Sequence, residues 1–302
     1  MTAPTRVAVA TFRDLPDLED DGHLLLDALR EAGLDPVVAS WDDPDVAWED
    51  VPLVLVRSTW DYMARREEFL AWTRRCRRTA NPAEVIAWNT DKHYLADLAE
   101  RGVPVVPTVF LEPGVDLSGG VDALLPEHLA GSDVVVKPAV GAGAGHTGRF
   151  RPGDAGALAL VQRLHAEGSS AMVQPYLDTV EAVGETSLIH LGGGFSHAIT
   201  KSALLTQHGE RGAFDHHEYV EEISPAGAGA AQHEVAEQVL AAVADAVPGH
   251  PLSYARVDLL PGADGPVLLE VELTEPSLFL EHAPESALRR WALHLARLVD
   301  ED

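Results

Sequence analysis

Residues 134–147 read Val-Val-Val-Lys-Pro-Ala-Val-Gly-Ala-Gly-Ala-Gly-His-Thr, an apolar run that ends in Lys137 and leads into a glycine-rich loop. Of the 22 lysines and arginines in the chain, three are lysine: Lys92, Lys137 and Lys201. A lysine ammonium is a compact point charge that the broad guanidinium fork does not imitate. The pattern therefore predicts that Lys137 binds a phosphate, against the alternative of chance placement on a solvated surface.

The glycine-rich loop fits two known patterns only in part. Gly143–Gly148 matches G-x-G-x-x-G, but a dinucleotide site needs a helix to begin at the loop, and Pro152-Gly153 disfavours one. The P-loop pattern fails because no Lys-Ser/Thr closes the glycines. What remains is a strand, a lysine, a loop and a second strand. Such a loop can fold over phosphates and donate backbone N–H groups, with a purely structural turn as the alternative.

Paired carboxylates lie near the end of the chain. Arg256-Val-Asp258 and Glu270-Val-Glu272 fall on two expected strands joined by a turn at Pro261–Gly265. Residues two apart on a strand share a face, so Glu270 and Glu272 project together and Asp258 meets them across the hairpin. Such carboxylates repel unless cations lie among them, and Mg²⁺ prefers oxygen ligands shared with phosphates. A solvated acidic strand is the alternative, although the apolar neighbours Val257 and Val271 indicate core strands.

Composition excludes several classes of protein. A formal net charge of −26 argues against a general nucleic-acid binder. We expect no membrane span, because no apolar run approaches ~18 residues. The single cysteine, Cys76, excludes an intramolecular disulfide and fits a reducing, cytoplasmic location. A small-molecule substrate is therefore expected, and whether the protein forms a homo-oligomer stays open.

Hydrophobic periodicity predicts strands alternating with helices, as in an α/β protein. The expected strands are 6–11, 37–39, 53–57, 105–111, 134–137, 172–176, 186–191, 195–204, 254–260 and 267–273. Helices are expected at 23–32, 65–78, 155–166, 230–246 and 285–299. A further helix is expected to begin with Thr90 as its cap, to carry Lys92 in its first turn, and to end before Gly102.

The chain resembles the ATP-grasp superfamily over about residues 90–280. The resemblance rests on the order of Lys92, Lys137 with its glycine-rich loop, and the two strands that carry Arg256, Asp258, Glu270 and Glu272. The resemblance implies an α+β ATP-grasp fold. A Rossmann-like pre-ATP-grasp domain (1–95) precedes a central subdomain with the glycine-rich loop (96–178) and a C-terminal subdomain with the metal site (179–302). It also implies ATP as cosubstrate and two Mg²⁺ ions.

The resemblance gives each site residue a role. Lys92 and Lys137 would hold the α- and β-phosphates, and Lys201 could reach the γ-phosphate. Asp258, Glu270 and Glu272 would hold the metal ions, and Arg256 would steady the transferred phosphoryl group. The expected nucleotide contacts are Gly141, Gly143, Gly145, His146 and Thr147 over the triphosphate and Gln174, Tyr176 and Leu177 at the adenine.

Two features depart from the superfamily pattern or leave it open. The metal strand usually ends in Glu-x-Asn, whereas this chain has Glu270-Val-Glu272. The acid that holds the ribose is either Glu181, by its distance from the adenine segment, or Glu185, by its place at the start of a strand.

Three stretches resemble the cycloserine synthetase group, the O-ureido-D-serine cyclo-ligases: Val54–Tyr62, Trp88–Lys92 and Leu269–Phe279. The resemblance implies that ATP activates a carboxylate as an acyl-phosphate, which the ureido nitrogen of the same molecule attacks. An intermolecular amino-acid ligase, a nicotinamide-dependent oxidoreductase and a nucleotide-binding regulator without turnover are the alternatives.

The small substrate is expected where a strand of the first domain ends, since ligands gather at the carboxyl ends of parallel strands. Arg57 would hold a carboxylate and Asp61 an ammonium. The full set of expected contacts is Arg57, Ser58, Thr59, Asp61, Glu275 and Ser277. In the alternative, Trp60 and Tyr62 pack a domain interface while Arg57 pairs with a nearby acid.

Overall fold

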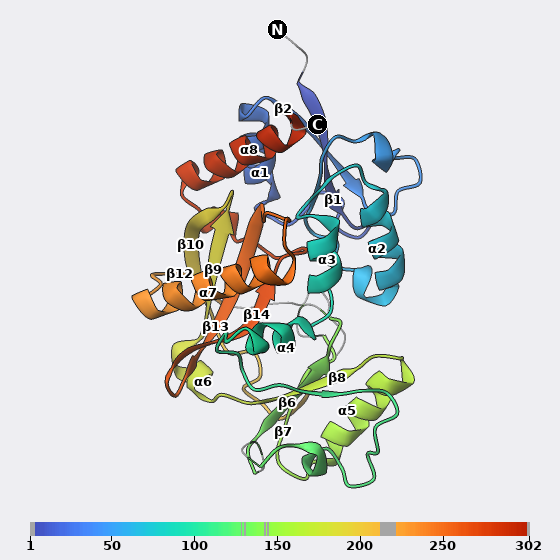
Figure 1. Ribbon diagram of the computed structural model, residues 1–302, viewed down its shortest axis with the longest axis vertical. Coiled ribbons are helices and arrows are strands. Elements are labelled where there is room, and N and C mark those ends of the chain that lie inside the picture. The colour runs from blue at the N-terminus through green and yellow to red at the C-terminus, as the bar shows by residue number, and fades with distance from the viewer. Residues whose placement is uncertain are drawn as a thin grey trace.

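The computed structural model describes residues 4–127, 129, 131–141, 143, 145–211 and 222–300. The described residues form three sheets, stacked along the long axis of the molecule (Figure 1). Within these residues, no helix combines the length and the apolar character that crossing a bilayer requires.

The first sheet is parallel, with strand order β2-β1-β3-β4. It alternates with helices as the sequence predicts, because β1 and β3 are apolar and buried. The elements are β1 (Thr5–Thr11), α1 (Gly22–Glu31), β2 (Leu34–Ser40), β3 (Val54–Val56), α2 (Arg66–Arg75), β4 (Thr79–Ala80) and α3 (Ala83–Asn89).

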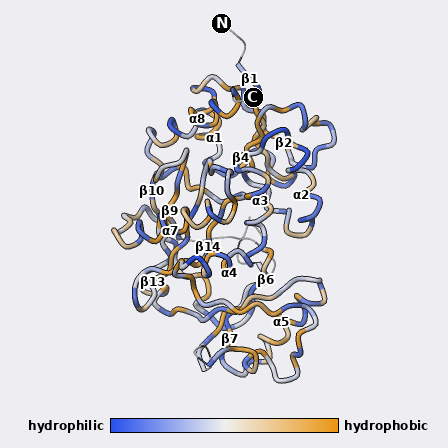
Figure 2. Tube along the Cα trace, in the orientation of Figure 1, coloured by the Kyte–Doolittle hydropathy of each residue, from blue (hydrophilic) through white to orange (hydrophobic). Residues whose placement is uncertain are grey.

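The last helix of the chain, α8 (Glu285–Asp300), packs against α1 of this first unit (Figure 1). Ala287, Trp291 and Leu295 are buried on one side of α8. The tube of Figure 2 accordingly alternates between hydrophobic and hydrophilic colours along this helix. The two ends of the described chain therefore share one hydrophobic core, which also includes Leu25 and Leu29 of α1.

The second sheet is antiparallel, with order β11-β7-β6-β8-β5, and α5 covers one side of it. The glycine-rich loop joins β6 to β7, so a strand and not a helix follows the loop, as the sequence predicts. The elements are β5 (Val109–Leu111), β6 (Val134–Pro138), β7 (Gly148–Phe150), α5 (Ala155–Ala166), β8 (Ala171–Pro175) and β11 (Gly209–Glu210).

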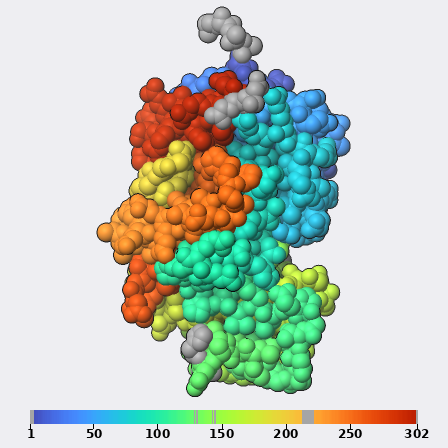
Figure 3. Space-filling model, in the orientation of Figure 1, coloured from blue at the N-terminus to red at the C-terminus, as the bar shows by residue number. Residues whose placement is uncertain are grey.

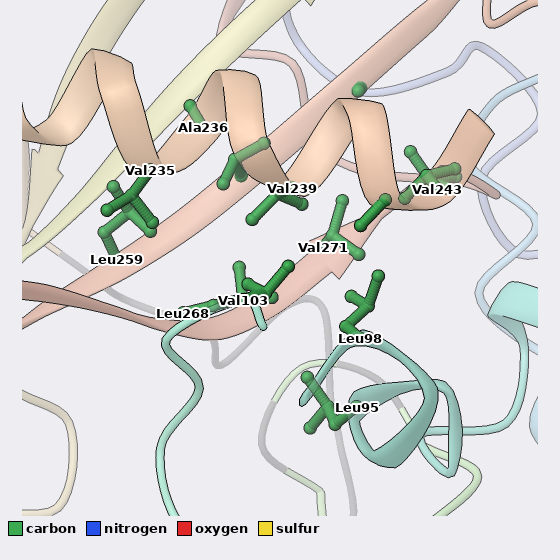
Figure 4. Close-up of a cluster of buried hydrophobic side chains, with 14 of the residues drawn as sticks. Leu95, Leu98, Val103, Val235, Ala236, Val239, Val243, Leu259, Leu268 and Val271 are labelled. Atoms are coloured by element: carbon green, nitrogen blue, oxygen red, sulfur yellow. The ribbon is translucent and has the colours of Figure 1, made fainter. Parts of the chain in front are cut away.

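The third sheet has order β12-β10-β9-β13-β14 and carries the acidic hairpin. Figure 4 shows α7 lying across β13 and β14, with Val235, Val239 and Val243 facing Leu259 and Val271. The remaining elements are α6 (Thr179–Val183), β9 (Glu185–Leu191), β10 (Gly194–Lys201), β12 (Ile223–Ala226), α7 (Ala230–Ala246), β13 (Tyr254–Gly262) and β14 (Gly265–Glu272).

One glycine turn in this sheet requires its residue type. Gly192 and Gly193 join β9 to β10 and have φ angles of 59° and 78°. Such left-handed values suit the two-residue turns that match the twist of a hairpin. A Cβ added at Gly192 would also lie 3.1 Å from the backbone of Trp291, so the turn lets α8 approach the sheet.

The prediction for Lys92 is wrong in its local structure. Thr90 ends α3 instead of capping the next helix, and α4 (Tyr94–Glu100) begins only after Lys92. Lys92 therefore lies in the turn between two short helices. On the face drawn in Figure 3 the surface of α4 adjoins that of α7.

Asn89, at the end of α3, fixes this turn onto β14. Its side chain donates a hydrogen bond to Val271 O (2.7 Å) and accepts one from Leu273 N (2.7 Å). The Tyr94 hydroxyl accepts a third hydrogen bond, from Val271 N (3.1 Å). These hydrogen bonds satisfy the backbone polar groups at the buried end of the strand. They also bring Lys92 to the acidic face of β14.

Candidate active site

A cavity of about 320 Å³ is lined by residues from the parts of the fold built on each of the three sheets. Its volume is within the range of small-molecule sites. Residues from the first unit, the glycine-rich loop, β8 and the acidic hairpin line it, among them Trp60, Lys137, Gln174, Glu185 and Glu270. The cavity thus collects most of the residues that the sequence singles out.

Lys92 links the glycine-rich loop to the acidic hairpin. Its Nζ lies 2.9 Å from Glu270 Oε1 and donates to Gly141 O at 2.5 Å, while its backbone N–H donates to Ala139 O at 2.9 Å. The side chains of Lys92 and Glu270 are 10% and 21% exposed, so the pair is largely removed from water. Lys92 therefore sits at the edge of the loop, where a nucleotide phosphate would need a cation.

Lys137, near the end of β6, also lines the cavity. No carboxylate in the described residues lies close enough to form an ion pair with it. Burial, together with the positive charge of Lys92, lowers its pKa, and the carboxylates of Glu270 and Glu185 offset only part of this effect. A cation in this state gains more from an anionic ligand than one that is already paired.

The acidic hairpin brings Asp258 to the side chains of Glu270 and Glu272, as the sequence predicts, but its register depends on a β-bulge between Asp258 and Leu259 that the sequence does not indicate. Asp258 stands opposite Glu270, and Arg256 stands opposite Glu272, across β13 and β14. Arg256 Nε lies 3.0 Å from Asp258 Oδ1, and the same guanidinium contacts Glu272. Lys201 contacts Asp258 at 3.2 Å and also pairs with Glu185. Cations therefore lie among the carboxylates, as their mutual repulsion requires.

These contacts move the pKa values of the acids in opposite directions. Burial raises the pKa of Asp258, but Arg256 and Lys201 more than offset it and hold it well below its usual range. Burial raises the pKa of Glu272 to about 7, only partly offset by Arg256. For Glu270, Lys92 and Lys137 outweigh burial and lower the pKa. Asp258 and Glu270 are thus the carboxylates that stay ionised most readily.

The donor set fits magnesium in its chemistry, because hard carboxylate oxygens suit this ion. The described residues hold no group of three His, Cys, Asp or Glu side chains arranged to bind a metal by themselves. Magnesium is normally bound by one or two carboxylates together with waters and substrate phosphates. A site in which the protein supplies only some of the ligands therefore agrees with magnesium binding.

The glycine-rich loop is divided between the cavity and the surface. Gly141, Gly143, Gly145 and Thr147 line the cavity, whereas residues 142 and 144 lie outside the described residues. His146 is not among the lining residues; its Nδ1 lies 3.4 Å from Arg163 Nη2 and 3.7 Å from Glu210 Oε1. The predicted nucleotide contact His146 therefore lies beside Arg163 and Glu210, next to two residues that line the cavity.

The predicted adenine segment follows β8. Gln174, Tyr176 and Leu177 line the cavity, together with the apolar side chains of Val106, Val180, Leu260 and Leu269. Gln174 Nε2 donates to Thr108 Oγ1 at 2.9 Å, and the Tyr176 ring lies 3.6 Å from the Arg149 guanidinium. A flat apolar surface of this kind suits a nucleobase.

The two candidate ribose acids occupy different places. Glu185 lines the cavity and contacts Lys201. Glu181 is outside the lining, where it accepts hydrogen bonds from Arg149 Nη1 (2.7 Å) and the Tyr176 hydroxyl (3.0 Å). Glu185 is therefore the acid with direct access to a ligand in this structure.

The substrate contacts predicted on the first unit do not reach the cavity. Arg57 is 1% exposed, pairs with Glu19 and donates to Pro276 O at 2.9 Å. Ser58 also bonds to Glu19, and Thr59 is fully buried. Asp61 accepts from Trp41 Nε1 at 2.7 Å. This arrangement agrees with the alternative in which Arg57 pairs with a nearby acid, because its guanidinium is taken up by Glu19 and Pro276 O.

Glu275 and Ser277, by contrast, line the cavity as predicted contacts. Sequence reasoning missed several other lining residues, namely Ser202, Ala203, Leu204, Leu205 and Phe279. Trp60 lines the cavity and donates from Nε1 to Glu275 O at 3.0 Å; the sequence predicts that its loop, residues 58–62, faces the cleft, with interface packing of Trp60 as the alternative. Its position immediately before Asp61, at a strand end, is the signal for that prediction.

Comparison with known proteins decides the family. The domain family described as "D-cycloserine synthetase DcsG, N-terminal domain" matches residues 7–84. "Cycloserine biosynthesis protein DcsG" from Streptomyces lavendulae is 39% identical over 271 residues, which are 88% of this chain and 89% of that protein. The chain belongs to the D-cycloserine synthetase family.

Solved structures support the same assignment. The crystal structure of D-cycloserine synthetase DcsG matches with a TM-score of 0.89 and 36% identity, over 97% of this chain and 99% of that one. A RimK domain ATP-grasp protein from Sphaerobacter thermophilus matches with a TM-score of 0.66 and 17% identity, over 97% and 99% of the two chains. This member of the D-cycloserine synthetase family therefore has the ATP-grasp fold.

Proposed function

We propose that the protein is an ATP-dependent ligase that closes O-ureido-D-serine into the ring of D-cycloserine, with release of ADP and phosphate. The observation that carries the proposal is the single cavity face on which Lys92, Lys137 and Arg256 meet the carboxylates of Asp258 and Glu270. Phosphoryl transfer needs such an arrangement, since the protein mainly positions the reactants and balances their charge.

The reaction balances as follows. A substrate carboxylate oxygen attacks the γ-phosphorus of ATP, and ADP leaves with the electron pair of the broken P–O bond. The nitrogen bonded to the aminooxy oxygen then attacks the carbonyl carbon, loses its proton, and expels phosphate. The five-membered ring formed first carries the carbamoyl group, which water then removes as carbamate.

The side chains would divide the work. Lys92 and Lys137 would bind nucleotide phosphates, with Lys201 placed near the transferred phosphoryl group. Arg256, fixed by Asp258, would stabilise the charge on the acyl-phosphate. Glu185 is the acid we propose for the ribose. Magnesium, held by Asp258, Glu270 and Glu272 with ATP, would supply further positive charge for phosphoryl transfer.

The glycine-rich loop would protect the acyl-phosphate. Gly141, Gly143 and Gly145 present backbone to the cavity, and a loop closed over the nucleotide keeps water from the reactive carbonyl.

The test is phosphate release across a panel of amino-acid carboxylates, with magnesium and ATP present. We expect O-ureido-D-serine alone to support full turnover and to give a cyclic product of the mass of D-cycloserine. Turnover only when a second amino acid is added, with a dipeptide as product, would instead identify an intermolecular ligase on the same fold.

A further inference from the structure

Glu275 is a buried carboxylate that lines the cavity and has no cationic partner in the described part of the chain. Its exposed fraction is 7%. Four other carboxylates of the cavity each contact a lysine or arginine: Glu185, Asp258, Glu270 and Glu272. For Glu275, no Lys, Arg or His nitrogen of the described residues lies within 4.0 Å. Among the carboxylates that line the cavity in the described residues, Glu275 is therefore the one without an ion pair, although the charge of Lys92 acts on it from farther away.

An unpaired charge in this position is unfavourable without a ligand. Burial, with the nearby charge of Glu272, raises the pKa of Glu275 to about 8, and the charge of Lys92 and a hydrogen bond with Tyr62 offset part of the effect. Burying a carboxylate without a cation costs free energy, and that cost is recovered when a cation arrives. The side chain is thus suited to bind a positively charged group of a ligand.

The backbone around Glu275 is fixed at residues 274–278, which we call the carbonyl strap. Five successive carbonyl oxygens lie within hydrogen-bond distance of five different side chains. The pairs are Tyr254 with Thr274 O (2.7 Å), Trp60 with Glu275 O (3.0 Å), Arg57 with Pro276 O (2.9 Å), Arg256 with Ser277 O (3.0 Å) and His197 with Leu278 O (3.1 Å).

The donors to the carbonyl strap come from three separate parts of the fold. Tyr254 and Arg256 lie on β13, His197 lies on β10, and Arg57 and Trp60 follow β3. Four of the five donors, all except Trp60, are buried, and their hydrogen bonds leave the strap little freedom. The backbone that carries Glu275 is therefore held in place before a ligand binds, which reduces the entropy that binding must overcome.

We propose that Glu275 binds the α-ammonium group of the amino-acid substrate and so selects amino acids over simple carboxylates. The inference rests on the proposed function. In that reaction the α-ammonium group takes no chemical part, yet it enters a cavity lined by Lys92, Lys137, Lys201 and Arg256. These cations repel an ammonium group, whereas Glu275 attracts it.

The carbonyl strap also relates Glu275 to the reaction centre. Arg256, proposed to stabilise the acyl-phosphate, donates to Ser277 O only two residues from Glu275. In an α-amino acid the ammonium and the carboxylate share one carbon atom, so their binding partners must lie close together. Arg256 and Glu275 satisfy this requirement because one strap holds both.

The variant Glu275→Gln keeps the size of the side chain and removes its charge. We expect the KM for O-ureido-D-serine to rise roughly 10- to 100-fold, which is the range for loss of a charge-assisted contact. The Kd of a non-hydrolysable ATP analogue should stay within about twofold, because Glu275 has no proposed nucleotide contact. Glu281→Gln is the matched control, since that side chain is 60% exposed, and its KM should not change.

A substrate without the ammonium group separates recognition from a general loss of activity. We compare O-ureido-D-serine with 3-(ureidooxy)propanoate, its des-amino analogue. The wild-type protein should prefer the amino acid, and Glu275→Gln should lose most of that preference. A variant that keeps the wild-type preference would overturn the assignment of Glu275.

Calorimetric binding of both compounds, with the ATP analogue present, makes the same comparison without turnover. If the wild-type protein binds O-ureido-D-serine but does not cyclise it, the proposed function fails while the role of Glu275 is still measured. If the wild-type protein binds the two compounds equally, the role of Glu275 fails whatever the reaction.

Discussion

Lys92 and Glu270 form an ion pair of 2.9 Å between the turn after α3 and the acidic strand β14. The pair exists although the two residues are far apart in the chain, because Asn89 fixes the turn onto β14. Without nucleotide, Lys92 thus balances an acid that we assign to magnesium. Binding of a magnesium–ATP complex would supply a phosphate for Lys92 and a metal ion for Glu270 at the same time.

The first prediction concerns Glu270→Gln. The substitution removes the charge at nearly constant volume, so the magnesium concentration that gives half-maximal activity should rise at least about tenfold. Magnesium titration of ATP turnover is the measurement. Glu281→Gln, an exposed glutamate, is the control. A wild-type magnesium requirement in Glu270→Gln would remove this residue from the metal site.

The second prediction concerns Lys137. In Lys137→Ala a charge-assisted phosphate contact of about 1.5–3 kcal/mol is lost, so kcat/KM for ATP should fall at least about tenfold. Lys137→Arg should not restore it, since a guanidinium has the wrong shape for a point-charge site. Steady-state kinetics with varied ATP measure both effects, and normal turnover by the alanine variant would contradict the assignment.

The third prediction tests the structural role of Arg57. Its replacement by alanine leaves Glu19 without its cation and Pro276 O without its donor, so the free energy of unfolding should fall by about 3 kcal/mol. Arg6→Ala is the control, because Arg6 and its partner Asp35 are 73% and 43% exposed, and it should cost less than about 1 kcal/mol. Urea unfolding measures both. If Arg57→Ala and the wild-type protein had equal free energies of unfolding, the structural role of Arg57 would be contradicted.

The fourth prediction concerns acid stability. Burial raises the pKa of Asp42, but hydrogen bonds from Arg65, Arg13 and Ser40 outweigh it and lower the pKa from 3.8 to about 2. A lowered folded-state pKa stabilises the protein above the unfolded value, and that stability is lost as pH falls from about 4 to 2.

Asp42→Asn should remove this part of the acid dependence. The side chain of Arg13 is 66% exposed, so water screens its ion pair with Asp42. We therefore expect the substitution to lower the free energy of unfolding by about 1 kcal/mol. Unfolding free energies of wild type and variant, measured between pH 6 and pH 2, should converge at the acid end. A constant difference across the range would contradict the linkage.

Much of the fold could be predicted from the sequence because its signals are local. Helices α5 and α7 have the predicted bounds, since each shows a sustained apolar period between clear ends. The meeting of Asp258 with Glu270 and Glu272 across the hairpin followed from the period of two, whereas the β-bulge that puts Asp258 opposite Glu270 had no signal in the sequence. The strand after the glycine-rich loop followed from Pro152-Gly153, which disfavours a helix.

What the sequence could not reveal depends on long-range packing. The break between α3 and α4 at Lys92 comes from the hydrogen bonds of Asn89 to β14, a contact that no local pattern indicates. Arg57 follows a parallel strand and was therefore predicted to bind a ligand. In the structure it forms an ion pair with Glu19, which lies in a loop distant in the sequence. The carbonyl strap was equally hidden, since its five donors come from three parts of the chain.

Ring closure through an acyl-phosphate fixes the identity of the nucleotide product, which can be measured. With O-ureido-D-serine, magnesium and ATP, we expect one ADP and one phosphate for each molecule of D-cycloserine formed, and no turnover with excess chelator. AMP and pyrophosphate as the stoichiometric products would instead indicate an adenylate, and would contradict the proposed roles of Arg256 and the acidic hairpin in phosphoryl transfer.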